Sequence, residues 1–485
     1  MSGTRKPWLP VLLLAAGGCG EVADDWFCSD ARCEWRDDEW ARVVSLANPS
    51  DPDPDYSNLY RDSAAAVALG KELYFDTGFS GVATQLDAIR RTSPPARADK
   101  DAPVNVSCAT CHNLMHGGVD TTSVPGHVSV GAGWTDVNAL PTLNSAYRKV
   151  VFWNGRADSL WALNVLVAES ITTMNGNRLA LAHRIADKYR ADYEPLFGPL
   201  PGLDDTTRFP LAGKPKLADK PDGAWEAMAP WAQIAVNAIL VNWGKAIAAY
   251  EYRLVSRDAP FDRFVTAGRD SDAISGAARR GARLFVGKAA CIDCHSGPQL
   301  SDEQFHNVGV PQAGTAVPTT GDCPASMVPY ACNCVAGTNC APWGAYDGLK
   351  RLSTSPWRRS CVFDDKNPAS VEPPCSDDTG DQSRDAYSKR ELTEDLKGAW
   401  RTPSLRNVAL TAPYMHDGTF ATLEDVVWHY NTGGRAATGE RVGVPAAQLK
   451  PIGLSAAEVA DLVAFLETLT GAPLDPALTT PPAAR

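Results

Sequence analysis

The sequence predicts a mainly α-helical protein of two domains, with few short strands and a cysteine-rich insertion. A length of 485 residues exceeds what one compact hydrophobic core usually supports. Helical spacing of apolar residues recurs along the chain, and its longest stretch covers residues 225–256. The pattern Cys-x-x-Cys-His occurs once in each half, at residues 108–112 and 291–295. We therefore expect two helical units that each carry one copy of the motif.

The first residues predict export. Arg5 and Lys6 precede the apolar run "WLPVLLLAAGG", which is shorter than the roughly 20 residues needed to cross a bilayer and is typical of a secretory signal. Small residues lead directly to Cys19, as at a bacterial lipoprotein cleavage site. The expected product is a periplasmic or cell-envelope protein whose only membrane attachment is a lipid on Cys19. The alternative is an ordinary signal followed by an unrelated cysteine.

The remaining domain limits follow from composition. Residues 20–60 are rich in Asp and Pro, whereas residues 63–76 and 275–295 have helical spacing. Ser455 and Glu458 have the spacing of a capping box, and Gly471 ends the helix that they begin. The expected divisions are a lipoprotein-type signal at 1–18, a tether at 19–60, an N-terminal domain at 61–268, a C-terminal domain at 269–471 and a tail at 472–485.

Cysteine usage agrees with an oxidising compartment. Of 13 cysteines, Cys19 is assigned to lipid and four belong to the repeated motif. An even remainder in an exported chain indicates disulfides. These eight are Cys28, Cys33, Cys323, Cys332, Cys334, Cys340, Cys361 and Cys375. Six of them lie in the Gly-, Pro- and Asp-rich residues 312–390, which we interpret as an insertion held by its own bridges, with a small Cys28–Cys33 loop near the start.

The charge balance argues against nucleic acid as a partner. The formal net charge is -11 and basic clusters are few, whereas phosphate backbones are bound by concentrated Lys and Arg. A small basic protein is compatible with this balance.

The repeated motif predicts two covalently bound c-type haems. Two thiols three residues apart can form thioethers with both haem vinyl groups, and the histidine that follows can ligate the iron. The expected attachment residues are Cys108, Cys111, Cys291 and Cys294, with His112 and His295 as proximal ligands. The alternative pools the four thiolates as one zinc site. Zinc would not demand a histidine at the same offset in both copies, and the copies lie in opposite halves of the chain.

Four stretches resemble the bacterial dihaem cytochrome c peroxidase and MauG family. They are "SCATCHNLMHGGVD", "FWNGRA", "LFVGKAACIDCHSGPQLSDEQFHNVGV" and "RTPSLRNVALTAPYMHDGTFATLEDVV". The resemblance covers roughly residues 60–471 outside the insertion. It implies two cytochrome c-like haem domains, an N-terminal haem that meets hydrogen peroxide and a C-terminal haem that receives electrons from a small cytochrome or another donor.

The resemblance also implies roles around the first haem. Trp153 matches the tryptophan that carries electrons between the haems, and an indole is oxidisable and polarisable. His127 matches a loop histidine that caps the peroxidatic iron at rest and leaves once the other haem is reduced. Thr173 stands where the family often has a glutamate that moves protons, so Glu169, one helical turn earlier, is the candidate substitute.

At the second haem the resemblance leaves a choice of ligand. Tyr430 stands where peroxidases place a ligating methionine, as in MauG-like members, and a phenolate favours high-valent iron and a low potential. Met415 is the rival ligand. A calcium ion between the domains is also implied, with the Asn138 side chain and the main-chain carbonyls of Thr411 and Pro413 as ligands.

Three functions are consistent with these features. The first is peroxide reduction with electrons passed from the C-terminal haem through Trp153 to the N-terminal haem. The second, suggested by Tyr430, is MauG-like oxidation of a protein or small-molecule partner through high-valent haem. The third is a non-catalytic, lipid-anchored electron carrier with both irons permanently six-coordinate. Many relatives dimerise, so a homodimer is a further expectation.

Overall fold

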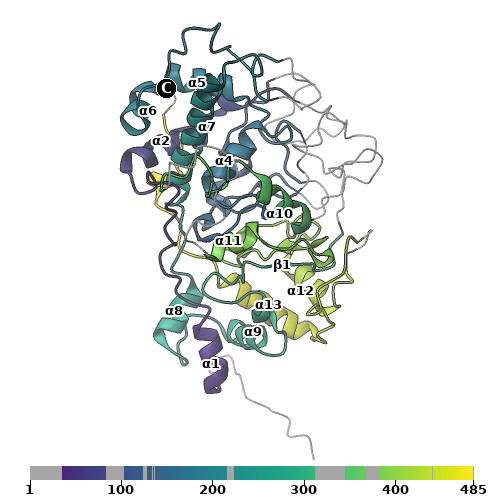
Figure 1. The fold of residues 1–485 in the computed structure, drawn as a ribbon. Helices are drawn as coiled ribbons and strands as arrows, with labels where there is room; N and C mark the ends of the chain where they lie inside the picture. Colours follow the sequence, from purple (N-terminus) through teal and green to yellow (C-terminus); the bar gives the residue numbers. More distant parts are fainter. Residues whose placement is uncertain are drawn as a thin grey trace, which may run out of the picture.

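The computed structural model describes residues 35–83, 103–123, 128–133, 135, 137–215, 223–311, 344–366, 375, 382–437, 439 and 441–483. Its α-helices are α1 (Asp37–Val44), α2 (Ala64–Phe75), α3 (Cys108–Cys111), α4 (Leu160–Glu169), α5 (Arg178–Arg184), α6 (Arg190–Phe197), α7 (Pro230–Glu251), α8 (Pro260–Ala267), α9 (Gly276–Val286), α10 (Ala345–Thr354), α11 (Gln382–Ser388), α12 (Leu423–Asn431), α13 (Ala456–Glu467) and α14 (Pro476–Thr479). The named strands of this part of the chain are β1 (Phe305–His306) and β2 (Trp400–Arg401), which pair antiparallel. The prediction of a mainly helical chain with few short strands is confirmed (Figure 1). No helix in the described ranges combines the length and apolar character needed to span a bilayer.

The first hydrophobic core is built from α2, α4, α5 and α7, which group together in the upper part of Figure 1. Ser63 caps α2 by accepting a hydrogen bond from the Ala66 N–H, and Pro230 begins α7 where a missing N–H does no harm. The helices α2 and α7 cross at Gly70, where a Cβ would lie 1.8 Å from the Ala246 carbonyl oxygen. Only glycine permits this approach.

The second core joins α8, α9, α12 and α13 in the lower part of the view. Its central crossing repeats that of the first core, because a Cβ on Gly281 of α9 would lie 1.9 Å from the Asp461 oxygen of α13. The predicted capping box is confirmed: Ser455 accepts from the Glu458 N–H, and Glu458 accepts from the Ser455 N–H at 2.8 Å. Each core therefore pairs a helix that precedes one Cys-x-x-Cys-His motif with a helix near the end of its unit.

The predicted tether and domain boundary are revised by the described residues. Within residues 35–60, α1 packs on α9, and Trp35, Val43 and Leu46 are buried in the second core. The helix α8, placed in the N-terminal domain by the boundary at 268, belongs to the second core as well. The Asp- and Pro-rich composition of residues 20–60 suggested a solvated linker. A few apolar residues are nevertheless enough to dock its α1 part on the second core.

The predicted tail also packs against the protein. It returns to the first core, where the Tyr250 hydroxyl donates to the Leu478 carbonyl at 2.6 Å and Lys71 donates to the Ala477 carbonyl at 2.9 Å. The C-terminus accordingly lies beside the helices of the first half in Figure 1.

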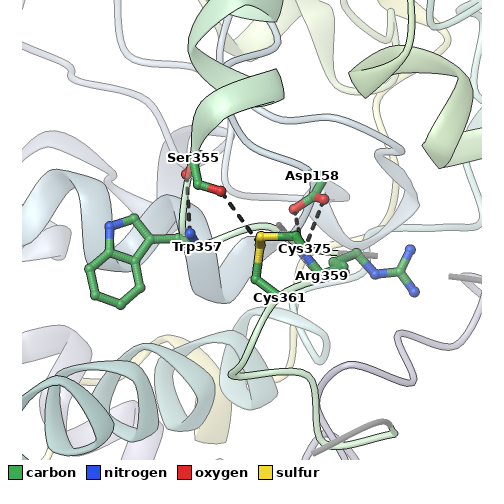
Figure 2. The surroundings of a disulfide bond; sticks show 6 residues. All are labelled: Asp158, Ser355, Trp357, Arg359, Cys361 and Cys375. Carbon is green, nitrogen blue, oxygen red and sulfur yellow. Dashed lines mark hydrogen bonds between the residues drawn. A yellow bond between two sulfur atoms is a disulfide. The ribbon is translucent and has the colours of Figure 1, made fainter. Parts of the chain in front are cut away.

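The described part of the insertion packs between the two halves. A third hydrophobic cluster combines Leu349 of α10 and Tyr387 near α11 with Val150 and Phe305. The disulfide Cys361–Cys375 confirms one bridge of the predicted set (Figure 2). The other expected disulfide cysteines and Cys19 lie outside the described residues.

A buried hydrogen-bond and ion-pair network holds this segment on the first half. Close to the disulfide, the Arg359 N–H donates to the Asp158 carboxylate at 3.1 Å, as Figure 2 shows. The Arg359 guanidinium pairs with Asp55 at 3.1 Å, and Lys245 of α7 pairs with Asp365. Because these charges are paired away from water, the described part of the insertion is held firmly against the first half.

Candidate haem sites

The first motif opens onto a cavity of about 850 Å³ whose walls include Cys108, Cys111 and His112. The single turn of α3 places the two cysteines on one side, as residues three apart in a helix. The Nδ1 of His112 donates to the Gly118 carbonyl at 2.9 Å. That bond places a proton on Nδ1, because a carbonyl can only accept, so the lone pair of the neutral ring lies on Nε2.

The second motif repeats this arrangement. Ala290 has a φ of 52° and turns the chain into the short helical turn Cys291–Asp293. The Nδ1 of His295 donates to the Leu300 carbonyl at 2.9 Å, so the lone pair of the neutral ring again lies on Nε2. Burial lowers the pKa of both His112 and His295, which favours the neutral imidazole that a metal requires.

These residues fit covalent haem better than zinc. The four motif cysteines are not joined in disulfides, and each pair sits beside a different hydrophobic core. Within the described ranges, the potential metal cluster is Cys294, Asp302 and His306, which does not pool the four thiolates. His306 is instead ion-paired with Asp302 at 2.7 Å, and this hydrogen bond raises the pKa of His306 to about 10.

Trp153 connects the cavity to the second half of the chain. It lines the cavity, is 9% exposed and donates from Nε1 to the Asn138 carbonyl at 2.9 Å. Its own carbonyl accepts from the Arg401 N–H of β2 at 2.8 Å. The strand β2 pairs with β1, which follows the second motif. The indole is therefore held at the junction between the two motifs.

Glu169 lines the cavity, and Arg178 donates to both oxygens of its carboxylate. Arg178 donates from Nε to Oε1 at 3.0 Å and from Nη2 to Oε2 at 2.5 Å. The guanidinium lies between the Trp225 and Trp357 rings, at 4.9 and 5.6 Å from their centroids. The second of these tryptophans comes from the insertion, which thus contributes to this wall. Thr173 also lines the cavity, and its hydroxyl caps the Val167 carbonyl at 2.7 Å.

Tyr430 of α12 lies near the second motif. Burial and the proximity of the Cys294 and Cys291 thiols raise the pKa of Tyr430. Among the hydrogen bonds of the described residues, none comes from its hydroxyl, which leaves the phenol oxygen available. Met415, the rival ligand, packs in a small apolar cluster with Phe420 and Val426.

The residues expected to bind calcium come together between the halves. The Asn138 amide nitrogen donates to the Pro413 carbonyl at 2.7 Å, and the Asn138 N–H donates to the His416 carbonyl at 2.7 Å. A rotation of this amide by half a turn would present its oxygen to the segment that contains Thr411 and Pro413. His127 lies outside the described residues.

Several site residues gave no signal in the sequence. Glu251 lines the cavity at the end of α7, where it fits the helical pattern without distinction. Glu303 joins Arg148 and Arg401 in a buried cluster, and burial lowers the pKa of Arg401 to about 10. The His416 ring stacks on Trp400 at 4.2 Å, and burial lowers its pKa to about 3. Arg401 and His416 lie in a stretch that resembles the family, and both are buried.

Comparisons with known proteins agree with this arrangement. The family model described as di-haem cytochrome c peroxidase matches residues 64–271. The chain is 31% identical to cytochrome-c peroxidase IdrP1 of Denitromonas iodatirespirans over 413 residues, which is 84% of this chain and 82% of the relative. It is 28% identical to the methylamine utilization protein MauG of Methylorubrum extorquens, over 84% of this chain and 78% of that protein.

Solved structures share the fold. A MauG-like protein associated with microbial copper homeostasis aligns with a TM-score of 0.53 at 23% identity, covering 90% of this chain and 97% of its own. The diheme peroxidase BthA of Burkholderia thailandensis aligns with the same TM-score at 20% identity, covering 90% and 93%.

Proposed function

The chain belongs to the di-haem cytochrome c peroxidase family, and from this premise we propose that it reduces hydrogen peroxide to water with electrons from a small cytochrome or a similar donor. Membership makes it a peroxidase-type oxidoreductase with two c-type haems. When bound at the first motif, haem would supply the iron at which peroxide is reduced. The observation that carries the proposal is the position of Trp153. This residue lines the cavity of the first motif, and its carbonyl accepts a hydrogen bond from β2, in the strand pair that follows the second motif.

Different residues of the chain would carry electrons, move protons and control access to the first site. Electrons would enter at the second motif and cross Trp153 to the first. Glu169, with Arg178 as its fixed counter-ion, is the proposed group that moves protons between the peroxide oxygens. His127 is proposed to cap the first site until the second haem is reduced.

Steady-state kinetics test this function directly. Protein reduced by one electron should turn over peroxide with a reduced small cytochrome as donor. Complete inertness after this pre-reduction, with both haems present, would contradict peroxide reduction.

Trp153→Phe is expected to slow peroxide-dependent oxidation of the donor by more than about tenfold, or about 1.4 kcal/mol of barrier. Phenylalanine keeps the shape of the buried ring but is much harder to oxidise. The haem content and cyanide binding at the first site should stay unchanged. Trp243→Phe is the control, because Trp243 of α7 is also buried, at 1% exposed, but does not line the cavity. Equal rates in wild type and Trp153→Phe would exclude this route.

MauG-like oxidation of a partner is the second candidate, and the position of Tyr430 beside the second motif favours it. We propose that Tyr430 would supply the second protein ligand to the iron of a haem bound there. Tyr430→Met should raise the potential of the second haem, because a thioether replaces an anionic oxygen. Met415→Leu should leave the spectrum and potential of that haem unchanged. The opposite pattern in a redox titration followed by optical and EPR spectra would assign Met415 as the ligand.

Two further features are proposals. Asn138, Thr411 and Pro413 would bind calcium, and metal analysis of dialysed holoprotein tests this. Export with lipid on Cys19 rests on the sequence, since residues 1–34 lie outside the described part of the chain. The mass of the mature N-terminal peptide tests the lipid.

A further inference from the structure

A second carboxyl group faces the first haem cavity, and the function proposed above does not use it. Glu251 ends α7, is 6% exposed and lines the cavity together with Cys108. The Asn164 side chain of α4 donates to its Oε2 at 3.0 Å. Its charge would further raise the pKa of the Cys108 thiol, which burial already raises, so the two groups are neighbours.

Glu251 has no positive partner among the described residues around it. The groups that face it are Asn164 from α4, Tyr74 from α2, Cys108 from α3 and its own neighbour Tyr250. Each is neutral when protonated, and none is a lysine, arginine or histidine. Burial consequently raises the pKa of Glu251 to about 8, and the hydrogen bond from Asn164 opposes this shift only in part.

Glu169 in the same cavity shows the contrast. Its carboxylate is held by two hydrogen bonds from Arg178, so its charge is balanced within the wall. The charge on Glu251 has no such balance. The pKa of Glu251 must therefore shift when another charge appears in the cavity, because electrostatic interactions are weakly screened there.

We propose that Glu251 binds one proton when the haem at the first motif is reduced and releases it when that haem is oxidised. The inference rests on the proposed attachment of haem to Cys108. Reduction converts ferric to ferrous iron with one electron from the donor, and the Glu251 carboxylate takes one proton from solvent to become a carboxylic acid. The net charge of the haem and Glu251 together then stays constant. Each electron that arrives is accompanied by a proton, and peroxide reduction consumes both.

The direction of the pH dependence follows from the charge of the haem. Ferrous iron in a porphyrin is neutral at its centre, so the pKa of Glu251 should stay near about 8 in the reduced state. The extra positive charge of ferric iron stabilises the carboxylate and lowers that pKa. Between the two pKa values the reduced protein holds one more proton than the oxidised protein. The potential should therefore fall with rising pH in this window and level off above about pH 8.

The test is a redox titration of the first haem at a series of pH values in wild type and Glu251→Gln. In wild type the slope should approach about 59 mV per pH unit, the value for a tenfold change in a one-electron equilibrium. Glutamine keeps the shape and the bond to Asn164 but cannot titrate, so this part of the slope should vanish. Haem propionates are present in both proteins and cancel in the comparison. Glu458→Gln, a surface change on α13, should keep the wild-type slope.

Asn164→Ala supplies a second variant. The hydrogen bond from Asn164 favours the ionised carboxylate, so its loss should raise the pKa of Glu251. The pH range in which the potential depends on pH should therefore move to higher pH. Infrared difference spectra, reduced minus oxidised, should show a protonated carboxyl band in wild type that is missing in Glu251→Gln. Identical slopes in wild type and Glu251→Gln, with no carboxyl band in either, would overturn the inference. If both haems are still present by pyridine haemochrome assay, the proposed peroxidase function survives that result.

Discussion

Replacement of Cys108 and Cys111 by serine should halve the haem content and abolish peroxide reduction. Serine cannot form the thioether bonds, and without them the haem would leave a cavity in which it has no other covalent attachment. The second motif belongs to the other core, so its haem should remain. A pyridine haemochrome assay on denatured protein, together with peroxide turnover, measures both effects.

The matched control is the same pair of changes at Cys291 and Cys294. It should also halve the haem content and stop turnover with a protein donor, because electrons could no longer enter. The first site should still bind cyanide or carbon monoxide in this variant. If both double variants behave alike toward these ligands, the division of labour between the two sites is wrong.

Glu303→Gln should destabilise the protein by about 3–5 kcal/mol, because it leaves two buried cations without their counter-charge. The Glu303 carboxylate contacts Arg148 at 3.1 Å and Arg401 at 3.3 Å, and both arginine side chains are at most 5% exposed. The loss should appear as a lower urea midpoint by circular dichroism. Since Arg401 also donates to the Trp153 carbonyl, electron transfer should slow as well.

Glu458→Gln provides the comparison for stability. Its partner Lys288 is 46% exposed, so the ion pair is screened by water and its loss should cost less than about 1 kcal/mol. Glutamine preserves the capping box with Ser455. Equal destabilisation by the two substitutions would show that the Glu303 cluster contributes no more than a surface pair.

The sequence predicted what local chemistry determines. The spacing of Cys108, Cys111 and His112 is a covalent requirement of haem attachment, and the capping box at Ser455 is a contact between neighbours. Such features depend on a few adjacent residues. Of the two, the capping box is confirmed by the structure.

Pairings between distant residues could not be predicted in this way. Glu169 was predicted only as a candidate proton-moving group, and the fold brings Arg178 onto it and holds the guanidinium between two tryptophans, one of them from the insertion. Glu251 looked like an ordinary helix residue, yet the fold buries it beside Cys108 without a cation. The chemistry of a carboxylate depends on what is placed next to it, and this is decided by tertiary packing.

The two ends of the described chain pack on opposite halves: residues 35–47 dock on the second core through α1, whereas the last described residues dock on the first. Neither half is consequently a removable module. After a cut in the connection between α7 and α8, the two fragments would remain associated. Expression of either half alone would expose apolar side chains that the other half normally buries.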